Sequence, residues 1–246
     1  MFEKIKQFLK EVKIELKKVV WPRVIDMNDR ALRNIDLKTR KDKFIITAAS
    51  EIMAILAMAK DIHDLKTRIE KILIGYNDKN TPIYVKDLGG ADAMVLLLKE
   101  AMNPNLVQAL EDVPALIHAG PFANIAHGCN SIAATKLALK LGDYVITEAG
   151  FGADLGMEKF LHLKMPNLKK QVDAVVLVVT LRAIKLHGQA SNYEEKNINA
   201  IENGLNHVEK HIENIQNFGL PFVISLNHFN NDDEEETAFM LEWAKS

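Results

Sequence analysis

The side chains best suited to chemistry are concentrated in residues 120–131, which read GPFANIAHGCNS. The aromatic face of Phe122 can stack on a flat ring. Asn124 and His127 supply hydrogen-bond donors and acceptors, and Gly128 lets the backbone approach a ligand closely. We therefore predict a ligand-binding loop that combines ring stacking with hydrogen bonding.

A second glycine-rich segment, residues 150–156, reads GFGADLG. A loop of this kind between a strand and a helix invites a dinucleotide-binding interpretation, but its spacing is GxGxxxG rather than GxGxxG. A dinucleotide site is therefore poorly supported. Two carboxylates belong to the same stretch, Glu148 and Asp154, and they either orient polar ligand groups or cap helices.

Three other reactive side-chain types are weaker candidates. His207 and His211 lie one helical turn apart, as in metal-binding helices, but position 208 is valine and no third ligand is evident. We expect a solvated helix face and no metal site. The single cysteine, Cys129, is expected to be a small packing residue rather than a nucleophile. Lys185 follows an apolar strand pattern and stays open as a phosphate or carboxylate contact.

The elements that must position these residues alternate between strands and helices. Short apolar runs rich in β-branched residues predict strands, and apolar residues at helical spacing predict helices. The alternation favours an α/β fold with a partial doubly wound, mostly parallel sheet and helices on both faces. The predicted strands are 83–85, 115–118, 143–147, 174–180 and 221–226; the helices are 50–59, 62–76, 91–102, 133–141, 197–218 and 235–245; loops are expected at 164–170 and 187–196.

Residues 2–20 form a distinct piece, in which apolar side chains recur at helical spacing and lysines fill much of the remainder. This pattern predicts a basic amphipathic helix, ended by Pro22. Such helices lie on anionic membrane surfaces or dock partner proteins. We therefore divide the chain into residues 1–22 and an α/β region of residues 23–246.

Composition narrows the class of protein. The chain has 246 residues, 48% of them hydrophobic, and a formal net charge of −2. That charge gives no electrostatic basis for general nucleic-acid binding. No apolar run approaches the roughly 20 residues that span a bilayer, and a single cysteine fits a reducing compartment. We expect a cytoplasmic protein.

Several long motifs, in order along the chain, closely resemble the formate–tetrahydrofolate ligase family. The resemblance covers roughly residues 23 to 246. Its strongest parts are residues 23–33 (RVIDMNDRALR), 50–55 (SEIMAI), 120–131 (GPFANIAHGCNS), 147–156 (TEAGFGADLG), 158–160 (EKF), 180–188 (TLRAIKLHG) and 209–214 (EKHIEN).

The resemblance implies ATP-dependent ligation of formate to tetrahydrofolate, which yields 10-formyltetrahydrofolate in one-carbon metabolism. ATP, Mg²⁺ and tetrahydrofolate would then be the cofactor and substrates. Phe122 would stack on the pterin ring; the alternative is a core phenylalanine beneath the loop. The other residues that the resemblance assigns to substrate binding are Pro121, Asn124, His127, Glu148, Gly150, Gly152 and Asp154.

Phosphoryl transfer needs a phosphate-binding loop, and the sequence contains no GxxxxGK[ST]. The family carries this loop before the DMNDR motif. We therefore expect an internal fragment that is inactive alone and that associates with a missing ligase half or with further copies. Residues 8–22 (FLKEVKIELKKVVWP) also resemble the cytoplasmic helix of the SecE translocase subunit. The alternatives are a folate-binding or subunit-interaction module without catalysis, or a membrane-surface or translocon-associated protein.

Overall fold

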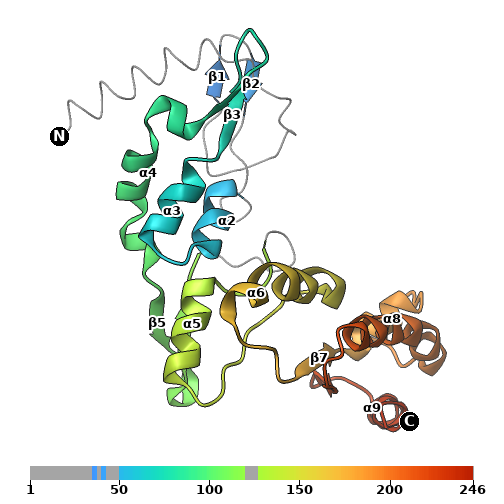
Figure 1. Ribbon diagram of the computed structural model, residues 1–246. Coiled ribbons are helices and arrows are strands. Elements are labelled where there is room, and N and C mark those ends of the chain that lie inside the picture. Colours follow the sequence, from blue (N-terminus) through green and yellow to red (C-terminus); the bar gives the residue numbers. More distant parts are fainter. Residues whose placement is uncertain (1–34, 38–39, 43–49, 120–126, 246) are drawn as a thin grey trace.

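A computed structural model describes residues 35–37, 40–42, 50–119 and 127–245 (Figure 1). The predicted N-terminal amphipathic helix lies outside the described residues, and so do Pro121, Phe122 and Asn124. Within the described ranges, no helix combines the length and the apolar character that crossing a membrane requires.

The described chain is a mixed α/β structure. Its strands are β1 (Ile35–Leu37), β2 (Arg40–Asp42), β3 (Leu73–Tyr76), β4 (Pro82–Tyr84), β5 (Asn105–Gln108), β6 (Pro114–Ile117), β7 (Val175–Val179) and β8 (Phe222–Leu226). Its α-helices are α2 (Glu51–Met58), α3 (Ile62–Ile69), α4 (Ala91–Leu98), α5 (Ile132–Leu141), α6 (Met165–Leu168), α7 (Leu181–His187), α8 (Ile198–Asn217) and α9 (Glu234–Trp243). Short 3₁₀ turns cover Val85–Leu88, Glu100–Met102 and Leu110–Asp112, and two π-helical turns are η5 (Gly152–Met157) and η6 (Phe160–Lys164).

Helices α2, α3 and α4 form one compact cluster (Figure 1). The side chain of Ser50 accepts a hydrogen bond from the backbone N–H of Met53 and so caps α2, and Asp61 caps α3 in the same way. Leu65 and Ile69 of α3, four residues apart, are fully buried against the apolar side chains of α2 and α4. Helical periodicity thus predicts the correct buried face.

The strands form four separate two-stranded sheets within the described residues. Three are antiparallel, β1–β2, β3–β4 and β5–β6, and only β7–β8 is parallel. The expected doubly wound, mostly parallel sheet is therefore not what these residues show. Neighbours in sequence pair through short turns here, and such hairpins produce antiparallel ladders.

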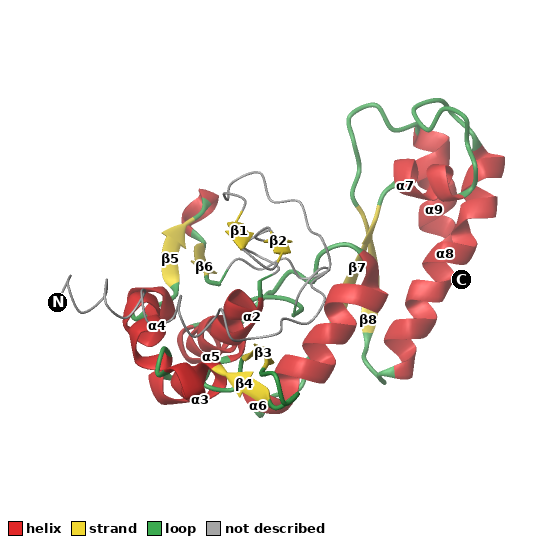
Figure 2. Cartoon of the chain, turned by 90° about the horizontal axis from the view of Figure 1, so that it is seen from above, coloured by secondary structure: helices red, strands yellow, loops and turns green. Residues whose placement is uncertain are grey.

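Residues from β7 to the C-terminal end of α9 make a second unit, in which α7, α8 and α9 lie beside β7 and β8 in both views (Figures 1 and 2). In α8 the buried residues Ile201, Leu205, Val208 and Ile215 follow helical spacing. A side chain at Gly204 would collide with the carbonyl of Ile184, so only glycine lets α8 approach α7 this closely.

Only one face of β7–β8 is covered by the described helices. Inward-facing residues of both strands join the apolar clusters of this unit. On the other face Val176 is 59% exposed, Val178 59% and Val223 60%. The prediction of helices on both faces is therefore not confirmed for the described part of the chain.

Three sequence predictions about individual elements are also wrong. Residues 143–147 form no strand, because no described strand lies beside them to supply ladder hydrogen bonds. Ile146 there is 96% exposed. The helix predicted at 62–76 ends at Ile69, and Leu73–Tyr76 pairs with β4 instead. Residues 164–168, expected in a loop, continue the helical turn of η6 into α6.

Candidate functional site

The two glycine-rich motifs of the sequence meet in the structure. Gly128 has a left-handed φ of +72°, and a Cβ there would lie 2.6 Å from the carbonyl oxygen of Gly156. Cys129 packs with Met157 and Phe160 in one buried cluster. The last turn of the predicted ligand loop therefore rests directly on η5 and η6, and glycine at 128 makes that approach possible.

Side-chain hydrogen bonds join β6 to the start of α5 and so bracket the predicted loop. Asn130 Nδ2 donates to the carbonyl of Leu116 at 2.6 Å. The buried His118 has Nδ1 2.6 Å from Ser131 Oγ and Nε2 2.6 Å from the carbonyl of Ala101. A carbonyl can only accept, so Nε2 of His118 donates and Nδ1 accepts from the serine hydroxyl.

Ser131 has a second role, because its Oγ also accepts from the backbone N–H of Ala134 and caps α5. Burial lowers the pKa of His118, which keeps the imidazole in the neutral form that this arrangement needs. The two residues thus link the end of β6 to the first turn of α5.

A fully buried lysine holds the turn between the loop and α5. Lys164 is 0% exposed, and its Nζ donates to the carbonyls of Gly128, of Cys129 at 2.8 Å and of Asn130 at 2.5 Å. Its Nζ also lies 2.7 Å from His127 Nδ1. Burial lowers the pKa of Lys164 to about 7.

His127 is the one predicted ligand residue of the loop that the structure places. It is 2% exposed, and burial together with the Lys164 charge lowers its pKa to about 4. The imidazole is therefore neutral at physiological pH, and it can hydrogen-bond a ligand but cannot attract one by charge.

Cys129 is buried, and burial raises the pKa of its thiol to about 11, so it is no nucleophile. Thr147 hydrogen-bonds its side chain, and Glu148 acts on it electrostatically. These interactions bring the start of the second motif to the same turn. The expectation of a small packing residue at 129 is confirmed by its burial.

The remaining predicted residues lie at the exposed side of this region. Gly150 and Gly152 have left-handed φ angles of +74° and +79°. Asp154 is exposed, and its Oδ1 lies 3.8 Å from His211 Nδ1 on α8. His187 and His207 stack with ring centroids 4.2 Å apart, yet no three metal-ligating side chains converge in the described parts of the chain.

The side chain of Lys185 forms a buried ion pair. Its Nζ lies 2.9 Å from Glu236 Oε2 and donates at 2.9 Å to the carbonyl of Glu195. Both charged side chains are almost fully buried, at 3% and 1% exposure. Lys185 therefore joins α7 to α9 through the carboxylate of Glu236, so its expected contact with the phosphate or carboxylate of a ligand is not supported.

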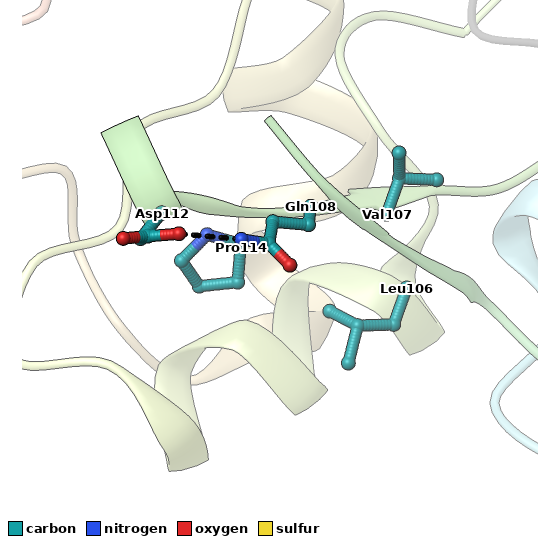
Figure 3. Close-up of a pocket in the computed structure, with 5 residues that line it drawn as sticks. All are labelled: Leu106, Val107, Gln108, Asp112 and Pro114. Carbon is teal, nitrogen blue, oxygen red and sulfur yellow. Dashed lines mark hydrogen bonds between the residues drawn. The ribbon is translucent and has the colours of Figure 1, made fainter. Parts of the chain in front are cut away.

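A pocket of about 320 Å³ lies on the β5–β6 hairpin, and Figure 3 shows its lining side chains: Leu106, Val107, Gln108, Asp112 and Pro114. Its single carboxylate, on Asp112, accepts a hydrogen bond from Gln108 Nε2 at 2.5 Å. None of the predicted site residues lines it, and it contains no acid–base pair. We place the candidate site at the 127–130 turn instead.

Sequence reasoning missed Lys164 and His118. Lys164 was assigned to a polar loop, although it lies four residues after the buried Phe160 and three after the buried Leu161, on the same side of the helical turn. That spacing is the signal that could have found it. His118 ends an apolar strand, and its partner Ser131 lies thirteen residues later, a separation that no local pattern reports.

Comparison with known proteins agrees with the motif pattern. A family model described as formate–tetrahydrofolate ligase matches residues 2–246. A relative named formate–tetrahydrofolate ligase, from Acholeplasma laidlawii (strain PG-8A), is 58% identical over 234 residues. That alignment covers 94% of this chain and 44% of the relative, so the chain spans less than half of the relative's length. The match begins at residue 2 and so includes the segment that resembles SecE, a resemblance that these comparisons do not support.

Proposed function

The chain belongs to the formate–tetrahydrofolate ligase family, and from this premise we propose that it is a tetrahydrofolate-binding portion of such a ligase. The complete reaction would join formate to tetrahydrofolate with ATP and Mg²⁺ and would yield 10-formyltetrahydrofolate. The supporting observation is structural: the 127–130 turn, within the predicted ligand loop, is fixed by Lys164 and Asn130, and His118 holds the adjacent Ser131.

The proposed roles of the site residues follow from the family motifs. Phe122 stacks on the pterin, and Pro121 and Asn124 complete its loop, while His127 supplies a neutral hydrogen-bonding group. Glu148, Gly150, Gly152 and Asp154 form the polar edge of the same site, which agrees with the contact between Cys129 and residues 147–148.

We propose that this chain does not catalyse ligation alone. Phosphoryl transfer requires backbone N–H groups around the phosphates, a lysine and a hydroxyl ligand for Mg²⁺, and no GxxxxGK[ST] is present in the sequence. Among the described residues two lysines are fully or almost fully buried; one faces carbonyls and the other a carboxylate. Neither is available to a nucleotide phosphate.

Two measurements test this function. Tetrahydrofolate should quench the fluorescence of Trp21 and Trp243, and Phe122→Ala should weaken that binding roughly tenfold, the order of one aromatic stacking pair. Tyr144→Ala removes an aromatic side chain that is 93% exposed and serves as the matched control. Pure chain with formate, ATP and Mg²⁺ should form no 10-formyltetrahydrofolate. Product formation, or equal affinities for the two variants, would contradict the proposal.

A second candidate function, subunit interaction without catalysis, has one observation in its favour. The uncovered face of β7–β8 presents Val176, Val178 and Val223, and contiguous exposed apolar side chains are typical of interaction surfaces. Val176→Lys should then lower self-association or co-purification with an intact ligase, measured by sedimentation, while leaving tetrahydrofolate affinity unchanged. Equal sedimentation of variant and parent would argue against this function.

We further infer that β7 and β8 belong to a doubly wound sheet in a complete ligase, with other strands and helices on the uncovered face. The protein is proposed to be cytoplasmic, and to act as a homo-oligomer or together with the remaining ligase half. The boundary at residue 22 and a membrane-surface or translocon role for residues 1–22 stay predictions. Flotation of the chain with anionic liposomes, compared with a version lacking those residues, would test that role.

A further inference from the structure

The environment of Lys164 fixes which nitrogen of His127 carries the proton. Below its pKa of about 7, Lys164 carries an ammonium group, which donates three hydrogens and accepts none. Here four neighbours, three carbonyls and His127 Nδ1, share these three hydrogens, all within 2.8 Å of the Lys164 nitrogen. A protonated Nδ1 would point its hydrogen at those of the ammonium. Nδ1 must therefore be the bare nitrogen, and in the neutral ring the proton lies on Nε2.

One competing contact can be judged by its length. Nδ1 of His127 is also 3.3 Å from the carbonyl of Gly128, which would favour a proton on Nδ1. That distance is beyond the usual range for an N–H···O bond, whereas the 2.7 Å contact with Lys164 is within it. The carbonyl of Gly128 also receives a hydrogen bond from Lys164 already. The lysine contact therefore decides the tautomer.

The other side of the same ring lacks a partner. His127 Nε2 is buried and makes no hydrogen bond with any described residue, and the residue is only 2% exposed. Buried polar groups in proteins are almost always paired, so this N–H calls for an acceptor other than the described residues. Because the imidazole is uncharged and enclosed, an uncharged carbonyl oxygen suits it better than a carboxylate, which would lose its hydration there.

We propose that Lys164 is a positioning residue that sets His127 in the Nε2–H tautomer, and that this N–H donates to the ring carbonyl oxygen of a bound pterin. The ligand half of this inference rests on the proposed function; the tautomer half does not. Lys164 itself touches no ligand and acts through His127 and the carbonyls of the turn.

The tautomer is measured directly on the full chain by long-range ¹H–¹⁵N correlation of the histidine rings near pH 6, where the His127 ring is neutral and Lys164 is charged. His127→Asn identifies the signals among the eight histidines. The expected spectrum has a protonated Nε2 and a bare Nδ1. A predominant Nδ1–H tautomer would overturn the role of Lys164.

Two variants then test the donor. The amide nitrogen of glutamine can occupy nearly the position of Nε2, so His127→Gln keeps a donor there; the shorter His127→Asn does not reach it. Tetrahydrofolate should bind the Gln variant close to parental affinity and the Asn variant roughly 2- to 10-fold more weakly, the range of one neutral hydrogen bond. p-Aminobenzoylglutamate, which has no pterin, should show no such difference. Equal losses for Gln and Asn, or a loss with the pterin-free probe, would overturn the assignment.

Lys164→Met tests the positioning role through the single cysteine. Because Cys129 lies in the turn that Lys164 holds, its buried thiol should react at least several-fold faster with a thiol reagent in this variant. Lys140→Met removes an exposed lysine of α5 and should leave the rate unchanged. Slow labelling in both variants would show that the turn does not depend on Lys164. If tetrahydrofolate does not bind the parent chain, both the proposed function and the proposed hydrogen bond to the pterin are wrong. The histidine ring spectrum and the labelling rate would still test the positioning role of Lys164.

Discussion

The charges of two buried lysines, Lys185 and Lys164, are stabilised by different kinds of partner. Lys185 meets the carboxylate of Glu236, so that a full positive charge faces a full negative one across α7 and α9. Lys164 meets three backbone carbonyls of residues 128–130, which supply partial charges only. Both side chains are almost completely removed from water, and yet only Lys185 has a charged partner.

Lys185 forms an ion pair that joins helices, whereas Lys164 supports a single turn. The Lys185–Glu236 pair is extended by the backbone N–H of Asn197, which donates to Glu236 Oε1 at 2.6 Å, so one ion pair joins three helices. Lys164 instead collects the carbonyls of consecutive residues and determines the shape of one turn. Carbonyls offset less of the cost of burying a charge than a carboxylate does. We therefore interpret Lys164 as a residue that shapes a binding site, and Lys185 as a residue that stabilises the fold.

Removing Lys185 should cause the largest loss of stability. Lys185→Met leaves the Glu236 carboxylate buried without its cation, and we expect the free energy of unfolding in urea to fall by about 3–5 kcal/mol. The double variant Lys185→Met, Glu236→Met removes both charges and should recover most of the loss. A single variant as stable as the parent would remove the contrast between the two lysines.

Removing Lys164 should cost less, because no charge remains behind. Lys164→Met leaves three carbonyls short of donors, and we expect a loss of about 2–3 kcal/mol. Urea unfolding near pH 7 measures it, with Lys140→Met as the control. A loss larger than that of Lys185→Met would reverse the comparison.

The stability gap between the parent and Lys164→Met should depend on pH. Folding lowers the pKa of Lys164 from 10.5 to about 7, so between those values the native state binds fewer protons than the unfolded chain. The free energy of unfolding of the parent therefore rises with pH relative to the variant, by at most about 1.4 kcal/mol per pH unit, and this contribution is lost as the pH falls towards 7. Unfolding curves at pH 7, 8 and 9 should show the trend, and a constant difference would contradict it.

Removing the cap of α5 or of α7 should lower stability by smaller amounts, and the loss should be greater for α5. Ser131→Ala removes the cap of α5 and leaves His118 Nδ1 without a donor, at a cost of about 1–2 kcal/mol. Thr180→Ala removes only the cap of α7 and should cost about 0.5–1 kcal/mol. Thermal unfolding of the two variants compares them directly. Equal losses would mean that His118 adds nothing to the Ser131 cap.

Asp154→Asn should have the smallest effect on stability. Its contact with His211 is long, at 3.8 Å, and half exposed, so we expect a change below about 0.5 kcal/mol. The proposed site role would appear instead as weaker tetrahydrofolate binding, measured by fluorescence. A clear loss of stability with unchanged affinity would show that Asp154 is structural.

Local sequence patterns predicted most helices correctly, because helix spacing and caps are encoded within a few residues. The helices predicted at 50–59, 133–141, 197–218 and 235–245, which correspond to α2, α5, α8 and α9, are examples. The sheet was predicted poorly. Residues 143–147 have strand composition but no partner strand in the described parts of the chain. Residues 73–76 continue a helical pattern, yet they pair with β4 as a strand. Strand formation depends on a neighbour that local sequence does not specify.

The sequence by itself determined the family, through motifs long enough to be specific, and it marked residues 120–131 as the loop where a ligand would bind. It also showed His127 to be a hydrogen-bonding group. Only the tertiary structure decided which atom of that ring is free, because Lys164 lies 37 residues away and reaches His127 through folding alone. The physical reason is the short range of hydrogen bonds: a proton's position depends on atoms within about 3 Å, wherever in the chain they originate.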